Sequence, residues 1–534
     1  MTRLISFIAK GFRGRADASG PTAALTPHSP LIAPWHATLL LVGALTLARL
    51  IALFVTPLEL YPDEAQYWVW AQSPALGYYS KPPLIAWLIA GTTALGGDSE
   101  PFVRLSSPLL HAIAALALFK AGERLFDART GLWAAVIYSL MPGVQLSAGV
   151  ASTDAALLCA LSLALWASAC LGWRDEETRG GAGHGPAPAL ALGIALGLAL
   201  LSKYAALYFL AGLVLHAIVH RSRGLFWSAG RVMVAALATL LLIAPNLIWN
   251  ALNDFATVSH TADNANWTAG ALFHPLKMLE FLASQFGVFG PVPFAILAML
   301  SVMAARRRKL EPRASLLLTL ALVPIVIVTV QALLSRAHAN WAAAAYVPAS
   351  VLVAHYILAR GQQVQRRLKA AIVIPQAAIA AVFILAACLP SLADAIGLAG
   401  SFKRARGWEA TTRLALSGAD SLGEPAAIVV DDRFTYNALR YYGRAHFGTP
   451  GGPGLLILPS HGRADSQAEI DAPLTSAETR LMLGMALDPA RWSAQRFDVS
   501  SPWRAYELEL GGGEHRTVHL AILQGYQGRD ASPD

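Results

Sequence analysis

Long apolar runs separated by short polar segments fill most of the first 392 residues. Most of these runs approach the roughly 20 residues that a helix needs to cross a bilayer. They predict eleven spans, at about 35–56, 102–120, 131–150, 153–172, 187–202, 204–220, 227–249, 286–305, 315–334, 341–359 and 370–392. A shorter apolar piece, Leu84 to Gly96, predicts an interfacial helix in the first polar loop.

From residue 393 onward the pattern is that of a mixed α/β domain. Buried-strand runs alternate there with amphipathic helical segments, which is typical of a small α/β domain. The strands are predicted at Ala426–Val430, Leu455–Leu458 and Thr517–Leu523, and the helices at Trp408–Leu416 and Arg433–Tyr442. The chain thus divides into a flexible tail (1–34), a helical membrane domain (35–392) and an α/β domain (393–534).

The composition agrees with a polytopic membrane protein. Hydrophobic residues make up 55% of the chain, charged residues only 14%, and the mean hydropathy is +0.48, whereas soluble domains carry about 25% charged residues. The three cysteines lie in apolar runs and match neither a disulfide framework nor a metal-binding spacing. We interpret them as small core residues.

The distribution of Lys and Arg predicts the orientation. With the N-terminus in the cytoplasm, the inner segments of 1–392 hold 21 Lys and Arg and the outer segments hold 5, as the positive-inside rule requires. The net charge of +8 therefore serves topology and contact with anionic membrane lipids, and not nucleic-acid binding. Eleven spans place residues 393–534 on the outer side of the membrane.

Polar residues of several connections converge on the outer face in this topology. They include carboxylates, cations and aromatic rings: Asp63, Glu64, Tyr67, Tyr79, Lys81, Asp154, Lys203, His260 and Arg336. A site for an anionic lipid-linked substrate needs these residue types. A carboxylate activates an acceptor, cations hold a phosphate, and rings pack against a sugar.

Structural interpretations stand beside the functional ones. Asp154 is also placed to cap the next helix, and Lys81 and Lys203 are also placed to snorkel from the membrane boundary. Arg49 lies within the first span, where a buried cation needs a partner. Asp63 or Glu64 is the nearest carboxylate in sequence.

The motifs of residues 35–360 resemble those of GT-C glycosyltransferases, specifically the protein O-mannosyltransferase and lipid A aminoarabinose transferase families (glycosyltransferase families 39 and 83). The first loop, YPDEAQYWVWAQSPALGYYSKPPLIAWL (61–88), carries most of the resemblance. Further motifs follow in order: STDAALL (152–158), LLSKYAAL (200–207), HTADNANW (260–267), FLASQFGVFGP (281–291) and AHANWAAAAY (337–346). The resemblance implies a GT-C fold of about 11–13 transmembrane helices with a small extracytoplasmic α/β domain.

The resemblance also implies an activity, the inverting transfer of a sugar from a polyprenyl-phosphate donor to an envelope acceptor. The acceptor is lipid A, another glycolipid, a glycan or a protein. Asp63 corresponds to the catalytic carboxylate, with Glu64 beside it and Asp154 as a second carboxylate. Lys81, Lys203 and Arg336 correspond to donor-phosphate ligands. The residues Tyr67, Tyr79, His260 and Tyr346 are expected to line the substrate site.

Two further expectations concern metal and alternative functions. Some aminoarabinose transferases have an acidic residue just before the loop lysine, where this chain has Ser80, so a divalent metal is not implied at this position. The competing interpretations are a lipid-linked sugar transporter or flippase, and a non-catalytic envelope-assembly protein. A transporter would place its charges near the membrane midplane, whereas here they collect at one face.

Overall fold

The computed structural model describes residues 32–173, 185–220, 225, 227–267, 272–306, 310–423, 426–449, 452–460, 464–492 and 496–528. Pro34–Asp534 form one compact unit. The predicted tail, except for its last three residues, lies outside the described residues. So do the predicted cytoplasmic basic residues of 174–184, 221–224 and 307–309.

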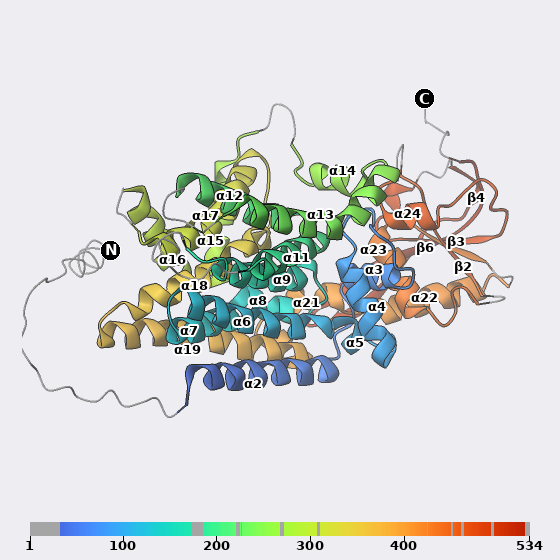
Figure 1. The fold of residues 1–534 in the computed structure, drawn as a ribbon. Coiled ribbons are helices and arrows are strands. Elements are labelled where there is room, and N and C mark those ends of the chain that lie inside the picture. Colours follow the sequence, from blue (N-terminus) through green and yellow to red (C-terminus); the bar gives the residue numbers. More distant parts are fainter. Residues whose placement is uncertain are drawn as a thin grey trace, which may run out of the picture. The chain divides into compact units, whose positions relative to one another are not determined.

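Helices dominate the chain up to residue 405 (Figure 1). Their order is α2 Pro34–Val55, α3 Pro62–Ala71, α4 Leu84–Gly96, α5 Glu100–Arg104, α6 Ser106–Leu125, α7 Ala128–Leu140, α8 Pro142–Ala148, α9 Thr153–Ala169, α11 Ala187–Ser202, α12 Ala206–Val219, α13 Ala229–Leu252, α14 Ala256–Asp263, α15 Pro275–Phe289, α16 Pro291–Ala305, α17 Pro312–Leu334, η1 Ala339–Ala345, α18 Tyr346–Leu358, α19 Gln362–Cys388, α20 Pro390–Ala395, α21 Ala399–Phe402 and η2 Lys403–Ala405. The predicted polytopic helical architecture is confirmed.

The number of full-length spans is smaller than the number of predicted apolar segments. In the described part of the chain, six helices are long and apolar enough to cross a membrane, or seven if the bent pair α7–α8 is one span. The predicted segments 153–172, 187–202, 204–220 and 286–305 correspond to shorter apolar helices. The predicted helix over Leu84–Gly96 is also present, as α4.

Proline and glycine account for two of the breaks. Pro142 begins α8, and its axis turns 63° from that of α7, because a proline ring inside a helix clashes with the preceding turn. Gly290 adopts φ 98° between α15 and α16, a conformation that favours glycine. The apolar pattern alone does not reveal these breaks, since apolar residues continue through them.

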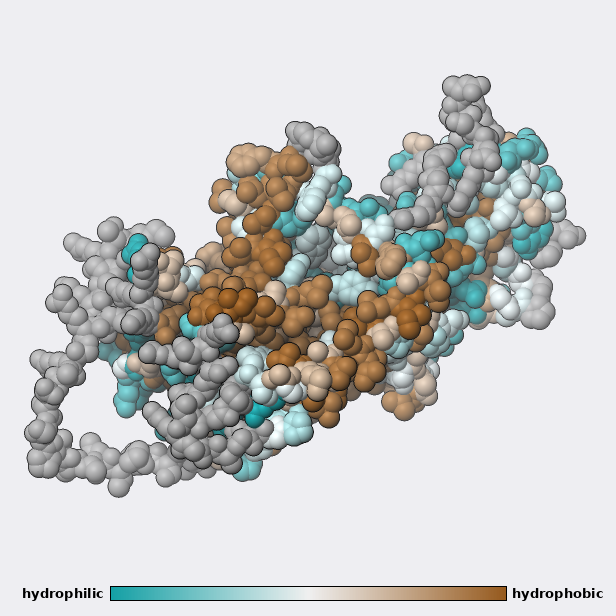
Figure 2. Space-filling view, turned by 45° about the horizontal axis from the view of Figure 1, so that its top comes forward, coloured by the Kyte–Doolittle hydropathy of each residue, from teal (hydrophilic) through white to brown (hydrophobic). Residues whose placement is uncertain are grey.

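The predicted cytoplasmic cations gather at one end of the helices, where α2 begins. The Lys120 ammonium lies 4.6 Å from the Trp35 ring centroid, and Arg313 donates to the carbonyl of Leu125. Figure 2 shows apolar residues over the helical part and more polar residues over the sheet end. This pattern fits a membrane-embedded helical part.

The C-terminal part contains a six-stranded mixed sheet in the order β2-β1-β3-β6-β4, with β5 also pairing with β6. Its elements are α22 Trp408–Asp420, β1 Ala427–Val430, α23 Arg433–Tyr442, β2 Gly454–Ile457, α24 Gln467–Asp471, β3 Met482–Ala486, η3 Pro489–Arg491, β4 Phe497–Ser500, β5 Arg504–Gly511 and β6 Glu514–Tyr526. Strands β1, β2 and β3 are parallel, and β6 runs antiparallel to β3. The predicted small α/β domain is confirmed.

Helix α23 of this domain packs against α3 of the first loop (Figure 1). The Tyr441 ring meets the Trp68 ring edge to face at 4.9 Å, and its hydroxyl donates to the carbonyl of Asp98. The neighbouring Tyr442 hydroxyl accepts a hydrogen bond of 2.7 Å from the backbone N–H of Leu60. The α/β domain therefore braces the loop that carries the adjacent carboxylates.

Candidate active site

The loop after α2 forms a short helix, α3, which hydropathy does not predict. Pro62 stands at its first position, and the Glu64 carboxylate turns back to accept from the backbone N–H of Tyr61, at 2.9 Å. Proline and a backward-reaching glutamate are both favourable at a helix start. The first turn of α3 therefore carries both Asp63 and Glu64, and its Glu64 side chain is turned back toward the start of the helix.

Glu64 is buried, and its carboxylate is fully engaged. Arg104 donates to both of its oxygens, at 2.9 and 2.8 Å, and the backbone N–H of Ala151 donates at 2.7 Å. The remaining Arg104 donors reach the carbonyls of Leu58 and Glu59. Because it accepts four hydrogen bonds, Glu64 has little capacity left to act on a substrate. This argues against the expected catalytic role of Glu64 and favours a structural one.

Asp63 remains accessible. Its side chain is 49% exposed, and its nearest cation is the Arg404 guanidinium, 3.8 Å away. A contact of this length between exposed groups is weak. Of the two adjacent carboxylates, Asp63 is therefore the one able to approach an incoming hydroxyl group.

Asp154 forms the centre of a second polar group at the start of α9. Lys203 donates to one of its oxygens at 2.8 Å, and Asn340 donates to the other at 2.7 Å. Lys203 follows the last turn of α11 and Asn340 lies in η1. Three connections that are distant in sequence thus meet, and Asp154 does more than begin a helix.

Lys81 lies opposite Tyr78 in a tight turn, where the Tyr78 N–H donates to the Lys81 carbonyl at 3.2 Å. Burial lowers the pKa of Lys81 to about 8. Lys203 and Arg433 lower this pKa as well, whereas the carboxylates of Asp63 and Asp154 raise it. The five charged groups therefore belong to one electrostatic cluster.

Aromatic side chains surround this cluster. Tyr67 is buried, and burial together with the charges of Asp63 and Asp154 raises the pKa of its hydroxyl well above the usual range. Tyr79 is also buried and meets His260 edge to face at 5.4 Å. Burial, with Lys81 and Arg433 nearby, lowers the pKa of His260 to about 4, so His260 is neutral at pH 7.

Two cations of the α/β domain complete the cluster and are not evident from the sequence. Arg404 approaches Asp63, and Arg433 at the start of α23 acts on Lys81, Tyr67 and His260. No ion pair joins Arg433 to any other described residue. Four cations, Lys81, Lys203, Arg404 and Arg433, thus lie around Asp63 and Asp154, whereas Asp263 and Asp465 act on His260. The positive charge around Asp63 and Asp154 suits an anionic ligand. Arg433 reaches the cluster because α23 packs on α3, and Arg404 reaches it from η2.

A cavity of about 420 Å³ opens beside the cluster. Lys81, Lys203 and Ser80 contribute polar groups to its wall, and α17 contributes Val328 and Val330. Aromatic residues complete the wall: Tyr204, Tyr208, Trp267 and Trp341. We call this cavity the cationic groove, because it combines two lysines with a largely apolar lining.

Two predicted site residues lie elsewhere. Arg336 is exposed and does not line the cationic groove. Tyr346 is fully buried in the helical core, where its hydroxyl donates to Gln285 and its ring stacks on Phe289. The expectation that Tyr346 lines the substrate site is therefore corrected to a packing role.

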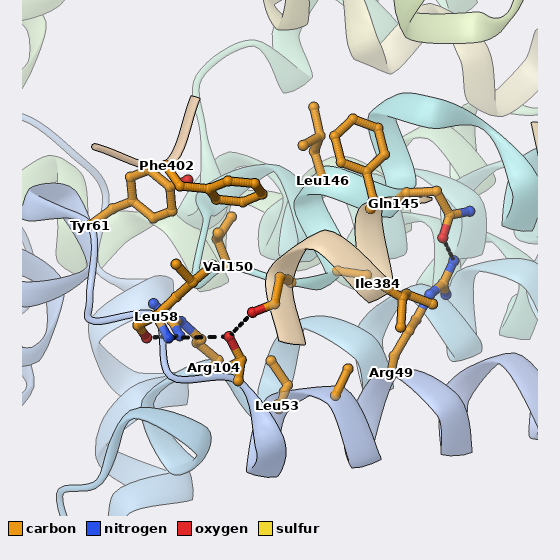
Figure 3. Close-up of a pocket in the computed structure, with 16 residues that line it drawn as sticks. Arg49, Leu53, Leu58, Tyr61, Arg104, Gln145, Leu146, Val150, Ile384 and Phe402 are labelled. Carbon is orange, nitrogen blue, oxygen red and sulfur yellow. Dashed lines mark hydrogen bonds between the residues drawn. The ribbon is translucent and has the colours of Figure 1, made fainter. Parts of the chain in front are cut away.

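Arg49 has a different partner from the expected carboxylates. Its guanidinium donates to the Ser139 carbonyl and to the Gln145 side chain, at 2.7 and 3.0 Å (Figure 3). The pocket in this figure, which Arg104 also lines, measures only about 90 Å³. Arg49 therefore ties α2 to α7 and α8, and Arg104 holds the loop before α3. The pocket that both line is too small for a sugar.

The carboxylates do not form a metal-binding set. Within the described residues, no group of three His, Cys, Asp or Glu side chains is arranged to hold a metal ion. Asp63 and Asp154 each face a cation, Arg404 and Lys203. The residues present therefore do not fit a divalent metal at this site.

Comparison with known sequences supports the resemblance inferred from the motifs. Residues 80–249 match the family model of dolichyl-phosphate-mannose-protein mannosyltransferases. The chain is 37% identical over 317 residues to the lipid A galacturonosyltransferase RgtD of Rhizobium johnstonii. That alignment covers 59% of this chain and 64% of the relative's length.

Solved structures show the same fold. ArnT from Cupriavidus metallidurans bound to undecaprenyl phosphate superimposes with a TM-score of 0.61 at 17% identity, covering 93% of this chain and 99% of that one. Its apo structure gives a TM-score of 0.58 at 16% identity, with the same coverage. The similarity to GT-C glycosyltransferases is confirmed, with an ArnT-like fold and an appended sheet domain.

Proposed function

We propose that this protein is an inverting glycosyltransferase of the bacterial inner membrane. It transfers a sugar from a polyprenyl-phosphate donor to an envelope acceptor at the periplasmic face. The observation that carries this proposal is the cationic groove, in which Lys81 and Lys203 share a wall with apolar and aromatic residues. A polyprenyl phosphate matches this wall, because its anionic head group suits the lysines and its long apolar chain suits the apolar lining.

Asp63 acts as the general base in this proposal. Its carboxylate takes the proton of the acceptor hydroxyl, and the hydroxyl oxygen attacks the anomeric carbon of the donor sugar. The new carbon–oxygen bond forms as the bond to the polyprenyl phosphate breaks, and that phosphate leaves with the electron pair. Attack on the face opposite the leaving group inverts the anomeric carbon.

Lys81 and Lys203 stabilise the departing phosphate. A lysine ammonium has three donors, so Lys203 can bind a phosphate oxygen while it keeps its bond to Asp154. Asp154 acts as a positioning residue, which aims Lys203. Arg433 adds a further positive charge to the same cluster. Fixed charges of this kind stabilise the transition state without rearrangement.

The relatives support this assignment of donor and acceptor. One solved neighbour is an ArnT bound to undecaprenyl phosphate, and the curated relative is a lipid A galacturonosyltransferase. We therefore propose an undecaprenyl-type donor and an envelope glycolipid acceptor such as lipid A. The clustering of charged residues at one end of the helices also favours an enzyme over a transporter or flippase, whose charges line the membrane midplane.

Exchanging Asp63 for asparagine tests the proposal. Asp63→Asn should abolish sugar transfer to envelope lipids, measured by mass spectrometry of the products, while the purified variant still binds undecaprenyl phosphate. The matched control is Glu409→Gln, a substitution of an exposed acid that pairs only within its own helix with Arg413. Unchanged turnover in Asp63→Asn would refute the assigned base.

Reporter fusions test the proposed orientation. A reporter fused after Arg308 should report the cytoplasm, and one fused after Asp420 should report the periplasm. The reverse result would place the Asp63 cluster at the cytoplasmic face and overturn the periplasmic assignment.

A further inference from the structure

A second and larger cavity lies between the first loop and the α/β domain. It measures about 960 Å³ and is lined on one side by α3 and the Tyr78 turn, and on the other by α23, α24 and β2. Trp249, at the end of α13, closes part of it. We call this cavity the interdomain cleft. Its volume lies in the range of sites that enclose organic ligands.

The walls of the interdomain cleft combine aromatic and hydrogen-bonding side chains. Trp249 and Tyr436 supply rings, and Asn253, Gln467 and Asp471 supply polar groups. Rings that pack against sugar faces, surrounded by planar groups that bond hydroxyls, are the usual means of holding a saccharide. The cleft is much more polar than the cationic groove, so it suits a hydrated ligand and not a lipid chain.

The position of Trp249 is set by contacts of α13 with the backbone of the first loop at Leu76 and Gly77. Gly77 lies so close to its indole ring that a Cβ atom there would stand 2.4 Å from a ring carbon. Asn246, one turn earlier on α13, donates to the carbonyl of Leu76 at 2.8 Å. The first loop and α13 are thereby locked together, and the Trp249 ring is held at the cleft.

Two arginines line the cleft, Arg440 in the last turn of α23 and Arg444 just after the helix ends. Arg444 donates to the Tyr441 carbonyl at 2.8 Å and lies over the Tyr441 ring, which holds its guanidinium in place. The side chain of Arg440 forms no hydrogen bond or ion pair with a described residue. The carboxylates of this cleft are otherwise engaged, since Asp98 accepts from the Trp68 indole and Asp471 accepts from Gln467. The arginines are therefore available to an added anion.

The interdomain cleft is separate from the cationic groove, but the two cavities flank the same turn. Tyr78 lines the cleft, while Ser80 and Lys81 line the groove. Between them, the backbone N–H of Tyr79 donates to Gln467 of α24 at 3.0 Å. A molecule in the cleft therefore lies beside the donor site without competing for it.

We propose that the interdomain cleft binds an anionic saccharide, namely a part of the acceptor glycan that carries a phosphate or carboxylate group remote from the reacting hydroxyl. The rings hold the sugar, and Arg440 and Arg444 hold its anionic substituent, because a guanidinium fork matches phosphate and carboxylate geometry. This inference rests on the proposed glycosyltransferase function and adds a second recognition site to it.

The test compares the full-length protein with a double variant, Arg440→Gln/Arg444→Gln. The probes are a glucosamine disaccharide with one phosphate, its dephosphorylated form, and a digalacturonate. We expect the wild type to bind an anionic probe at least tenfold more tightly than the neutral one, and the double variant to lose this preference. Comparing the affinities of the phosphorylated disaccharide and the digalacturonate shows which anion the cleft prefers. Equal binding of all three probes, or an unchanged preference in the variant, would overturn the inference.

Steady-state kinetics distinguish acceptor binding in the interdomain cleft from the chemical step. The double variant should raise the acceptor KM about tenfold, with the donor KM and kcat unchanged. Ser73→Trp, at an exposed position of the cleft wall, should fill the space and raise the acceptor KM without removing an arginine. Arg413→Gln, on the exposed face of α22, is the matched control.

The outcomes distinguish this inference from the proposed function. An unchanged acceptor KM in both cleft variants, while Asp63→Asn is inactive, would refute the cleft and leave the glycosyltransferase intact. Arginine-dependent binding of anionic disaccharides by a protein whose transfer is insensitive to Asp63→Asn would refute the proposed chemistry and support the cleft.

Discussion

Replacing Glu64 with glutamine should destabilise the fold, whereas the same change at the adjacent Asp63 should not. Glutamine nearly preserves the shape of Glu64 but removes the charge that faces Arg104, a residue only 2% exposed. It also places an amide N–H₂ group among donors, because every partner of the Glu64 carboxylate donates to it. Arg104 would keep two carbonyl acceptors but lose its counter-charge.

The magnitude follows from the burial of both partners. Removing one member of a buried ion pair costs about 3–5 kcal/mol, since the other charge stays in a poorly hydrated site. Asp63 is half-exposed and 3.8 Å from its nearest cation, so its neutralisation should change stability by less than about 1 kcal/mol. Thermal unfolding in detergent should show an apparent Tm lower by about 5 °C or more for Glu64→Gln alone.

A double-mutant cycle checks the origin of this loss. Arg104→Gln should destabilise by a similar amount, and Glu64→Gln with Arg104→Gln should cost less than the sum of the two single changes, because neither charge is then left unpaired. A Glu64→Gln variant with wild-type Tm and no transfer activity would refute the reasoning, because it would make Glu64 a participant in the chemistry.

Three further predictions concern the donor site. The donor kcat/KM should fall as the pH rises through about 8, because Lys81 loses its charge there, and Lys81→Arg should move this fall to higher pH in a pH–rate profile. Lys203→Met should raise the donor KM about tenfold in steady-state assays, since a charged hydrogen bond is lost; an unchanged donor KM would argue against a phosphate contact. Val330→Trp, at an exposed position of the groove wall, should weaken undecaprenyl phosphate binding in a titration, and equal affinity would place the chain elsewhere.

Much of the architecture can be predicted where proline, glycine or charged residues mark the ends of a clear hydrophobic pattern. The predicted bounds of α4, α11 and α23 match the observed Leu84–Gly96, Ala187–Ser202 and Arg433–Tyr442, because proline, glycine or charged residues end each apolar or amphipathic run. Helix α3 was not predicted, since its ten residues mix charge and aromatic groups without a clear period. Strands β3, β4 and β5 were not predicted either: β4 and β5 are largely exposed, and β3 is a buried run of only five residues, Met482–Ala486, without β-branched residues.

The candidate site could be predicted only in part, because some of its contacts join residues that are far apart in the sequence. Charge counting and motif order predicted Asp63, Lys81, Asp154 and Lys203 as site residues, and the structure places them close together. Motif order favoured Asp63 over Glu64 as the catalytic carboxylate, but it could not show what holds Glu64, because its partner Arg104 lies 40 residues away in the sequence. Nor could it find Arg433, whose place depends on packing between distant parts of the chain.

The contacts of the α/β domain indicate that it belongs to the site and is not only an appended module. The Glu59 carboxylate, in the loop before α3, accepts from the backbone N–H groups of Trp408 and Glu409 at the start of α22. Together with the bonds of Tyr442 and Gln467, these contacts tie both sides of the first loop to the domain. Asp63 and Lys81 project from the loop segments thus held. Since catalysis requires groups fixed to within a fraction of an ångström, the domain that supplies Arg404 and Arg433 would also set the geometry of Asp63 and Lys81 in the proposed mechanism.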